Sequence, residues 1–139
     1  MPALACIHFQ SQCATAMAFY AQVFGGTDLQ LMGHADGPGA PEAWKASPRV
    51  MHAQVTIRDG TQMASDYPPG TTVDDQRGFS MMQSAPDVVS AHRVFGALCD
   101  QGTVIDPIKS SFISPAFGMV QDRFGTRWII PAMQQGAAS

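Results

Sequence analysis

Residues 50–67 read VMHAQVTIRDGTQMASDY, and this stretch decides the fold. Apolar side chains recur at every second position of its first half: Met51, Ala53, Val55 and Ile57. The residues between them are polar, and alternation with period two is typical of a strand with one buried face. Asp59-Gly60 is a strong signal for a two-residue hairpin turn. The stretch therefore predicts an antiparallel hairpin with strands at 50–58 and 61–67.

The residues before this hairpin predict a strand, a helix and another strand. Apolar positions spaced three and four apart indicate an amphipathic helix, which Ser11 would cap and Gly25 would end. A segment rich in glycine and proline follows and is long enough to be a functional loop. The expected elements are a strand at 3–10, a helix at 12–24, a strand at 28–32 and a loop at 34–48.

The second half repeats this order. The expected elements are a strand at 78–83, a helix at 88–101 and strands at 103–108, 117–122 and 126–130. Residues 1–139 therefore form a single domain built of two repeats, about 1–70 and 76–133. We expect an α+β fold in which two βαβββ modules form one cup-shaped, eight-stranded mixed sheet with the helices on its outer face.

Composition excludes several classes of partner. The chain has 139 residues and a net charge of -3, so it lacks the basic excess that nucleic acid attracts. No run approaches the roughly 18 apolar residues of a membrane helix, and the N-terminus lacks the basic flank of a signal peptide. Three scattered cysteines, Cys6, Cys13 and Cys99, fit a reducing compartment, so we expect a cytoplasmic protein.

Several motifs resemble the vicinal oxygen chelate superfamily, which includes glyoxalase I, bleomycin-resistance proteins and extradiol dioxygenases, and in particular its PhnB-like branch. The matching stretches are Ile7-His8-Phe9, Cys13 to Gly26 with Phe19-Tyr20, Met51-His52-Ala53, Met63 to Asp66, and Phe117 to Gly125 with Trp128. The resemblance implies a homodimer and a ligand-binding cup. Ile113 stands where the branch usually has Trp, which changes the rim of the cup.

The metal ligands of that superfamily have no counterpart here. Counting from the shared motifs, the ligand positions fall at Ala5 or Leu4, near Phe79 and near Ile129, none of which can bind a metal. The sequence has a single Glu, Glu42, and it lies in the long loop. We therefore expect no metal and no other cofactor.

Polar residues on the strands are the main candidates for ligand contacts. His8 and His52 lie on polar strand faces, either as hydrogen-bonding or acid/base groups in the cup or as satisfied side chains at a strand or dimer contact. Gln54 shares the face of His52 and is either an amide partner for a ligand or solvated. Ser65 and Asp66 end a strand, either as acceptors at the floor of the cup or as a turn cap.

Aromatic residues in the loops complete the candidate site. Trp44 is either a lid over the cup or an anchor for its loop or for a partner subunit, and Phe112 has the same two interpretations. The many methionines, Met119 among them, are either an adaptable apolar lining or core. His34 and His92 are expected to face solvent.

These features favour a protein that binds a small apolar or mixed-polarity ligand without a metal, as bleomycin-resistance proteins do. One alternative is a metal-dependent lyase, isomerase or dioxygenase with shifted ligands such as His8, His52 and Asp66. Another is a dimeric interaction module without a pocket. No cluster of Arg and Lys is present to grip a phosphonate, and no glycine-rich loop is present to hold a nucleotide.

Overall fold

The first helix, α1 (Cys13–Phe24), forms where the apolar spacing predicts it. In the computed structural model, which describes residues 3–58 and 60–133, one side of this helix is buried. The buried residues recur at intervals of three and four: Cys13, Ala16, Met17, Tyr20 and Val23. Gly25 adopts the left-handed conformation with φ 68°, which a glycine accommodates without strain, and the helix ends there.

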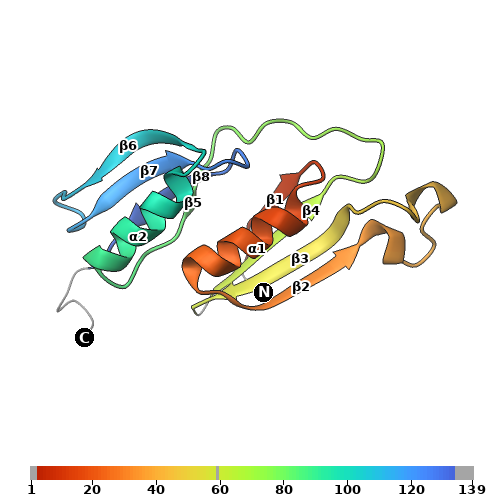
Figure 1. The fold of residues 1–139 in the computed structure, drawn as a ribbon, viewed down its shortest axis with the longest axis horizontal. Coiled ribbons are helices and arrows are strands. Elements are labelled where there is room, and N and C mark those ends of the chain that lie inside the picture. Colours follow the sequence, from red (N-terminus) through yellow and green to blue (C-terminus); the bar gives the residue numbers. More distant parts are fainter. Residues whose placement is uncertain (1–2, 59, 134–139) are drawn as a thin grey trace. The chain divides into compact units, whose positions relative to one another are not determined.

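Four strands complete the first unit. They are β1 (Cys6–Phe9), β2 (Thr27–Gly33), β3 (Val50–Ile57) and β4 (Gly60–Asp66), hydrogen-bonded in the order β1-β4-β3-β2. β1 runs parallel to β4, and the other pairs are antiparallel. Figure 1 shows α1 lying across one face of this sheet, where Ile7, Ala53 and Val55 are buried. The predicted hairpin is present, although Asp59 of its turn lies outside the described residues.

The second unit repeats this plan. It contains β5 (Met81–Met82), α2 (Val88–Cys99), β6 (Thr103–Lys109), β7 (Phe117–Gln121) and β8 (Arg127–Pro131), with strand order β5-β8-β7-β6. Again the first strand is parallel to the last, and the other pairs are antiparallel. Asp87 caps α2, because its carboxylate accepts a hydrogen bond from the Ser90 backbone N–H at 2.7 Å.

The expected α+β class and its two βαβββ modules are confirmed. The eight strands of the described residues are hydrogen-bonded into two mixed sheets of four. The chain divides into two compact units, Met1–Asp74 and Asp75–Ser139. One strand is much shorter than predicted: β5 spans two residues instead of 78–83, since residues 78–80 form no strand pairing.

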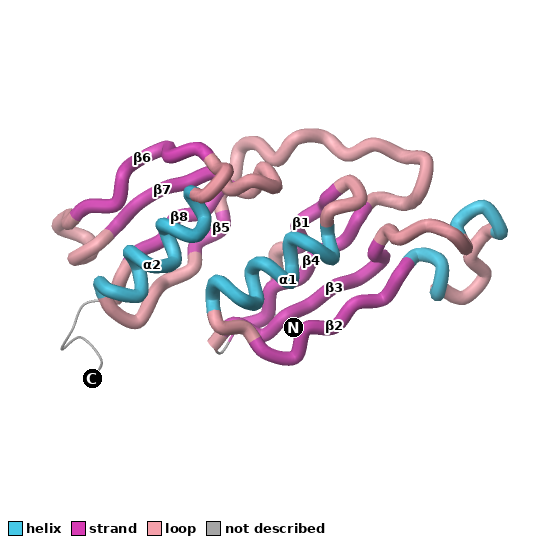
Figure 2. The backbone as a smooth tube through the Cα atoms, in the orientation of Figure 1, coloured by secondary structure: helices cyan, strands magenta, loops and turns pink. Residues whose placement is uncertain are grey.

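The long loop after β2 is more ordered than its composition suggests. It contains two short 3₁₀ turns, η1 (His34–Asp36) and η2 (Glu42–Trp44), which Figure 2 shows as separate coiled segments. His34 was expected in solvent, and that prediction is wrong. Its side chain is only 7% exposed, and its Nε2 lies 2.8 Å from the backbone oxygen of Asp66. His92, on α2, is exposed as predicted.

Both described helices have 12 residues, fewer than a membrane crossing requires.

Candidate functional site

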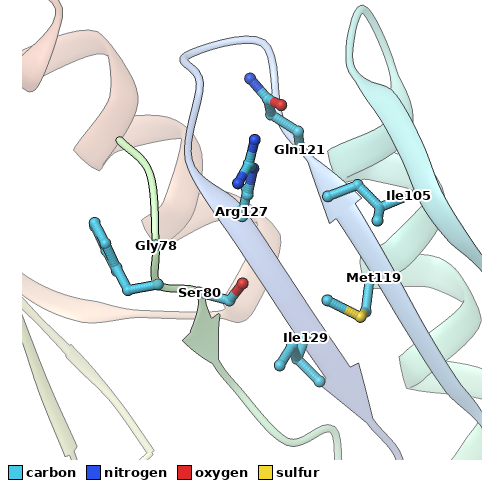
Figure 3. A pocket seen from close by; sticks show the side chains of 8 residues that line it. Gly78, Ser80, Ile105, Met119, Gln121, Arg127 and Ile129 are labelled. Atoms are coloured by element: carbon cyan, nitrogen blue, oxygen red, sulfur yellow. The ribbon is translucent and has the colours of Figure 1, made fainter. Parts of the chain in front are cut away.

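A hollow of about 580 Å³ lies on the second unit, on the face of its sheet opposite α2. Its lining comes from β6, β7, β8 and the segment that leads into β5: Gly78, Phe79, Ser80, Ile105, Met119, Gln121, Arg127 and Ile129. Figure 3 shows these side chains around the hollow. All of them belong to the second unit, Asp75–Ser139.

Strand alternation separates the lining from the core. Along β7 and β8 every second residue is buried, and the residues between them are only half-buried. The buried set packs beneath α2, where the Phe95 ring lies so close to Gly118 that a Cβ there would meet it at 2.6 Å. The half-buried set includes Met119, Gln121, Arg127 and Ile129, which therefore face the other way and line the hollow.

The register of β7 and β8 gives the hollow two different ends. Gln121 is the Cα partner of Arg127, and Met119 is the Cα partner of Ile129. Residues directly opposite each other on antiparallel strands have neighbouring side chains on the same face. The first pair makes a polar end and the second an apolar end, as Figure 3 shows. The lining can therefore contact a polar group and an apolar body of one ligand.

An irregularity in β6 adds an apolar side chain to the lining. The register between β6 and β7 shifts between Val104 and Asp106, so the residue between them has no Cα partner. Bulges of this kind bend a strand and redirect a side chain. The residue concerned is Ile105, which is 46% exposed and lines the hollow.

Arg127 dominates the electrostatics of the hollow. Its Nε is buried and has no hydrogen-bond partner in the part of the chain that the structure describes. None of the eight lining residues is acidic. The carboxylate of Asp106, which follows Ile105 along β6, lies 3.7 Å from the Lys109 ammonium and is not part of the lining. The hollow therefore carries one positive charge that no carboxylate of its lining balances.

The first unit presents two hydrogen-bonded polar pairs on the open face of its own sheet. His8 and Ser65 are Cα partners on β1 and β4, and His8 Nδ1 lies 2.9 Å from Ser65 Oγ. The His8 ring also packs edge-on against Tyr67, with ring centroids 5.2 Å apart. On β3, His52 Nε2 lies 2.9 Å from Gln54 Oε1. These four predicted site residues thus lie on one face but are already paired with one another.

Asp66 lies on the opposite face of β4 and stabilises the backbone. It is 2% exposed, and its two carboxylate oxygens accept hydrogen bonds from the backbone N–H groups of Cys13, at 3.0 Å, and Val50, at 2.8 Å. Ser11, which was expected to cap α1, makes no cap bond and accepts a hydrogen bond from Arg49 Nε at 3.0 Å. The N-terminus of α1 is therefore held by Asp66 instead.

The position of Asp66 separates it from the two histidines that the alternative metal-dependent interpretation combined with it as shifted ligands. Both of its oxygens are engaged on the buried face, whereas His8 and His52 belong to the other face. Across residues 3–58 and 60–133, no three His, Cys, Asp or Glu side chains are placed to hold a metal ion. The hollow does not suit a metal cation either, because the one charged group of its lining is the positive guanidinium of Arg127. We derive no chemistry through a metal.

The two predicted aromatic residues lie outside the hollow. Trp44 is half-buried and packs edge-on against His34, with ring centroids 5.5 Å apart, so it anchors its own loop. Phe112 is 96% exposed and does not line the hollow.

None of the seven predicted ligand contacts lines the hollow, and sequence reasoning missed its polar end entirely. Phe79 and Ile129, the positions at which metal ligands were sought, do line it, and so does Met119. The signal for Gln121 and Arg127 was available in the sequence. Both residues flank the turn of the predicted hairpin at 117–130, in phase with Met119 and Ile129.

This arrangement of two βαβββ units is the fold of the vicinal oxygen chelate class. A fosfomycin resistance protein from Listeria monocytogenes and a glyoxalase-related enzyme from Fulvimarina pelagi have it too, with TM-scores of 0.64 and 0.57. Identities of 7% and 13% limit that likeness to the fold.

Within this class the chain belongs to the PhnB-like family, whose model is described as 3-demethylubiquinone-9 3-methyltransferase and matches residues 2–131. Protein YjdN of Escherichia coli is 26% identical, covering 97% of each chain. The crystal structure of PA1353 from Pseudomonas aeruginosa has a TM-score of 0.86 at 29% identity, covering 97% of this chain and 99% of that one. The PhnB protein of Bacillus cereus has a TM-score of 0.72 at 20% identity, covering 96% and 100%.

The family description names a methyl transfer, and the hollow is a poor match for the usual donor. S-adenosylmethionine carries a carboxylate that Arg127 could pair, but it also carries a sulfonium and an ammonium group, and both cations need carboxylate or carbonyl partners when they leave water. The lining offers no carboxylate and presents the Arg127 guanidinium, which would repel both groups. The residues of the hollow therefore do not fit that donor, and we derive no methyl-transfer step.

Proposed function

We propose that this protein binds a small molecule of mixed polarity in the hollow of its second unit, without a metal. The observation that carries this proposal is the two-ended lining. Met119 and Ile129 can cover an apolar body, while Gln121 and Arg127 can hydrogen-bond a polar group next to it. Ligand sites in proteins are typically apolar hollows with a few placed polar groups of this kind.

The size of the hollow supports the same proposal. Sites for small molecules have volumes of about 300–1,000 Å³, and the value of about 580 Å³ falls within that range. Met119 adds adaptability, because its unbranched thioether side chain can adjust to ligands of different outline. One alternative that the sequence left open is an interaction module without a pocket. That alternative does not explain why a positively charged side chain lies beside an apolar lining.

Filling the hollow tests the proposal. Met119→Trp places a large ring at the apolar end of the hollow, whereas Val89→Trp adds the same ring on α2, where Val89 is 80% exposed. A library of small aromatic and aliphatic compounds, each with one polar group, is screened against the wild type by saturation-transfer NMR. Compounds that bind should lose their signal with Met119→Trp and keep it with Val89→Trp. Failure to bind any compound, or equal binding to Met119→Trp, would contradict the proposal.

We also propose a homodimer, and the exposed edge of the first sheet supports it. Among the described strands β2 pairs on one side only, with β3, and its side chains include the exposed Leu29, Leu31 and Met32. Edge strands with exposed apolar residues readily pair with another chain. Light scattering coupled to size exclusion should give twice the chain mass, and Leu31→Lys should reduce it to one chain mass. A monomeric wild type would contradict the proposal.

A further inference from the structure

We infer that the ligand of this hollow is a small carboxylate with an apolar body, and that Arg127 recognises the carboxylate. This inference rests on the proposed function, because it specifies the chemistry of a ligand for the same hollow. Three observations support it: the unused hydrogen-bonding capacity of Arg127, the single positive charge of the lining, and the neutral amide donor beside Arg127.

Arg127 has hydrogen-bonding capacity that the described part of the chain leaves unused. Its guanidinium makes no hydrogen bond or ion pair within residues 3–58 and 60–133, and its buried Nε is unsatisfied. Other basic side chains of this unit are engaged, since Arg123 contacts Asp100 at 3.1 Å and Lys109 lies near Asp106. A buried donor without a partner is costly, and an anion in the hollow would satisfy it.

The geometry of a guanidinium suits a planar oxyanion. The Nε–H and a neighbouring Nη–H of arginine can donate two parallel hydrogen bonds to the two oxygens of one carboxylate. The Nε of Arg127 has no partner among the described residues, and because it is buried, the fork forms with a ligand when the side chain turns its Nε toward the hollow. Gln121, the Cα partner of Arg127, adds a neutral amide donor at the same end of the hollow.

The charge of the lining favours a monoanion. Arg127 is the one charged residue among the eight that line the hollow, so it balances a single negative charge. A phosphate or phosphonate dianion would leave a second charge to Gln121 and Ser80, which are neutral. Charges that leave water without a partner are strongly disfavoured. The apolar end at Met119 and Ile129 then selects carboxylates that carry an aromatic or aliphatic body.

The test compares carboxylates with their uncharged amides of the same shape. The probes are benzoate, 2-naphthoate, 4-phenylbutyrate and octanoate, each paired with its primary amide, and 2-naphthyl phosphate serves as the dianion. Binding is measured by isothermal titration calorimetry on the full chain. The proteins are the wild type, Arg127→Gln and Arg127→Lys, together with Arg93→Gln. The last variant removes the same charge from an exposed position of α2.

We expect at least one carboxylate to bind about tenfold or more tightly than its amide, as charge-assisted hydrogen bonds predict. Arg127→Gln should abolish that difference, Arg127→Lys should retain part of it, and Arg93→Gln should leave it unchanged. If amides bind as tightly as carboxylates and Arg127→Gln changes neither, this inference is wrong while the hollow remains a binding site. Tighter binding of the naphthyl phosphate would also overturn it. If no probe binds and the wider library yields none, the proposed function itself fails.

Discussion

Replacing Asp66 by alanine removes the acceptor for two buried backbone donors at once. The carboxylate oxygens accept from the N–H groups of Cys13 and Val50, at 3.0 and 2.8 Å, and Asp66 is 2% exposed. These bonds connect the end of β4 to the start of α1 and to the start of β3. We therefore expect Asp66 to contribute to stability and not to ligand binding.

The cost follows from the two donors. A buried donor that loses its partner costs about 1–3 kcal/mol, so Asp66→Ala should lower the free energy of unfolding by about 2–6 kcal/mol. That is a large part of the roughly 5–15 kcal/mol of a typical domain. Asp66→Asn retains one acceptor oxygen and turns an NH₂ group toward the other N–H, so it should cost about half as much and remain folded.

Urea denaturation of the wild type and of each variant measures these losses. Ser65→Ala is the matched control, since Ser65 is the neighbouring residue on β4 and its half-buried hydroxyl hydrogen-bonds two side chains, His8 and Cys6, and no backbone donor of another element. A change of that kind should stay within about 0.5 kcal/mol. If Asp66→Ala and Ser65→Ala are equally mild, Asp66 does not hold these elements together and the assignment is refuted.

Three further substitutions, one in the first unit and two in the second, test how the two hydrophobic cores are packed. Burial, together with the charge of Asp66, raises the pKa of the Cys13 thiol from 9.0 to about 12. The neutral Cys13 thiol therefore contributes its full stability below about pH 9, and this contribution falls as the pH rises toward 12. Urea unfolding at several pH values should show this fall in the wild type, and Cys13→Ala should remove it. In α2, an Ala at Gly96 meets no atom within 4 Å, so Gly96→Ala should stabilise by about 0.5–1 kcal/mol, and a loss would contradict the packing. In β7, Gly118→Ala would place its Cβ 2.6 Å from the Phe95 ring, so thermal unfolding should occur at a lower temperature.

The elements with strong periodicity could be predicted closely. The helix expected at 12–24 is observed at Cys13–Phe24, because its buried stripe is local to the segment. The cap of this helix could not be predicted. Ser11 was the natural candidate by position, but Ser11 has φ 75° and the acceptor comes from Asp66, which is distant in the sequence. Long-range hydrogen bonds of this kind leave no periodic signal.

The candidate site was harder to predict than the fold. The alternation of β1 and β3 places His8 and His52 on polar strand faces, which predicts ligand contacts, yet both histidines are paired, with Ser65 and Gln54. Arg127 resembled an ordinary polar residue near a hairpin turn. The role proposed for Arg127 depends on its Nε having no partner among the described residues, and that property exists only after the strands have paired.

A titration of protein labelled with ¹³C at its methionine methyl groups tests the central claim most directly. The ligand is the carboxylate or other compound that binds most tightly in the screens described above. We predict that the Met119 methyl resonance shifts in a saturable way, while the resonance of Met17, a buried residue of α1 in the first unit, stays in place. Saturable binding without any change at Met119 would contradict the assignment of the hollow as the binding site.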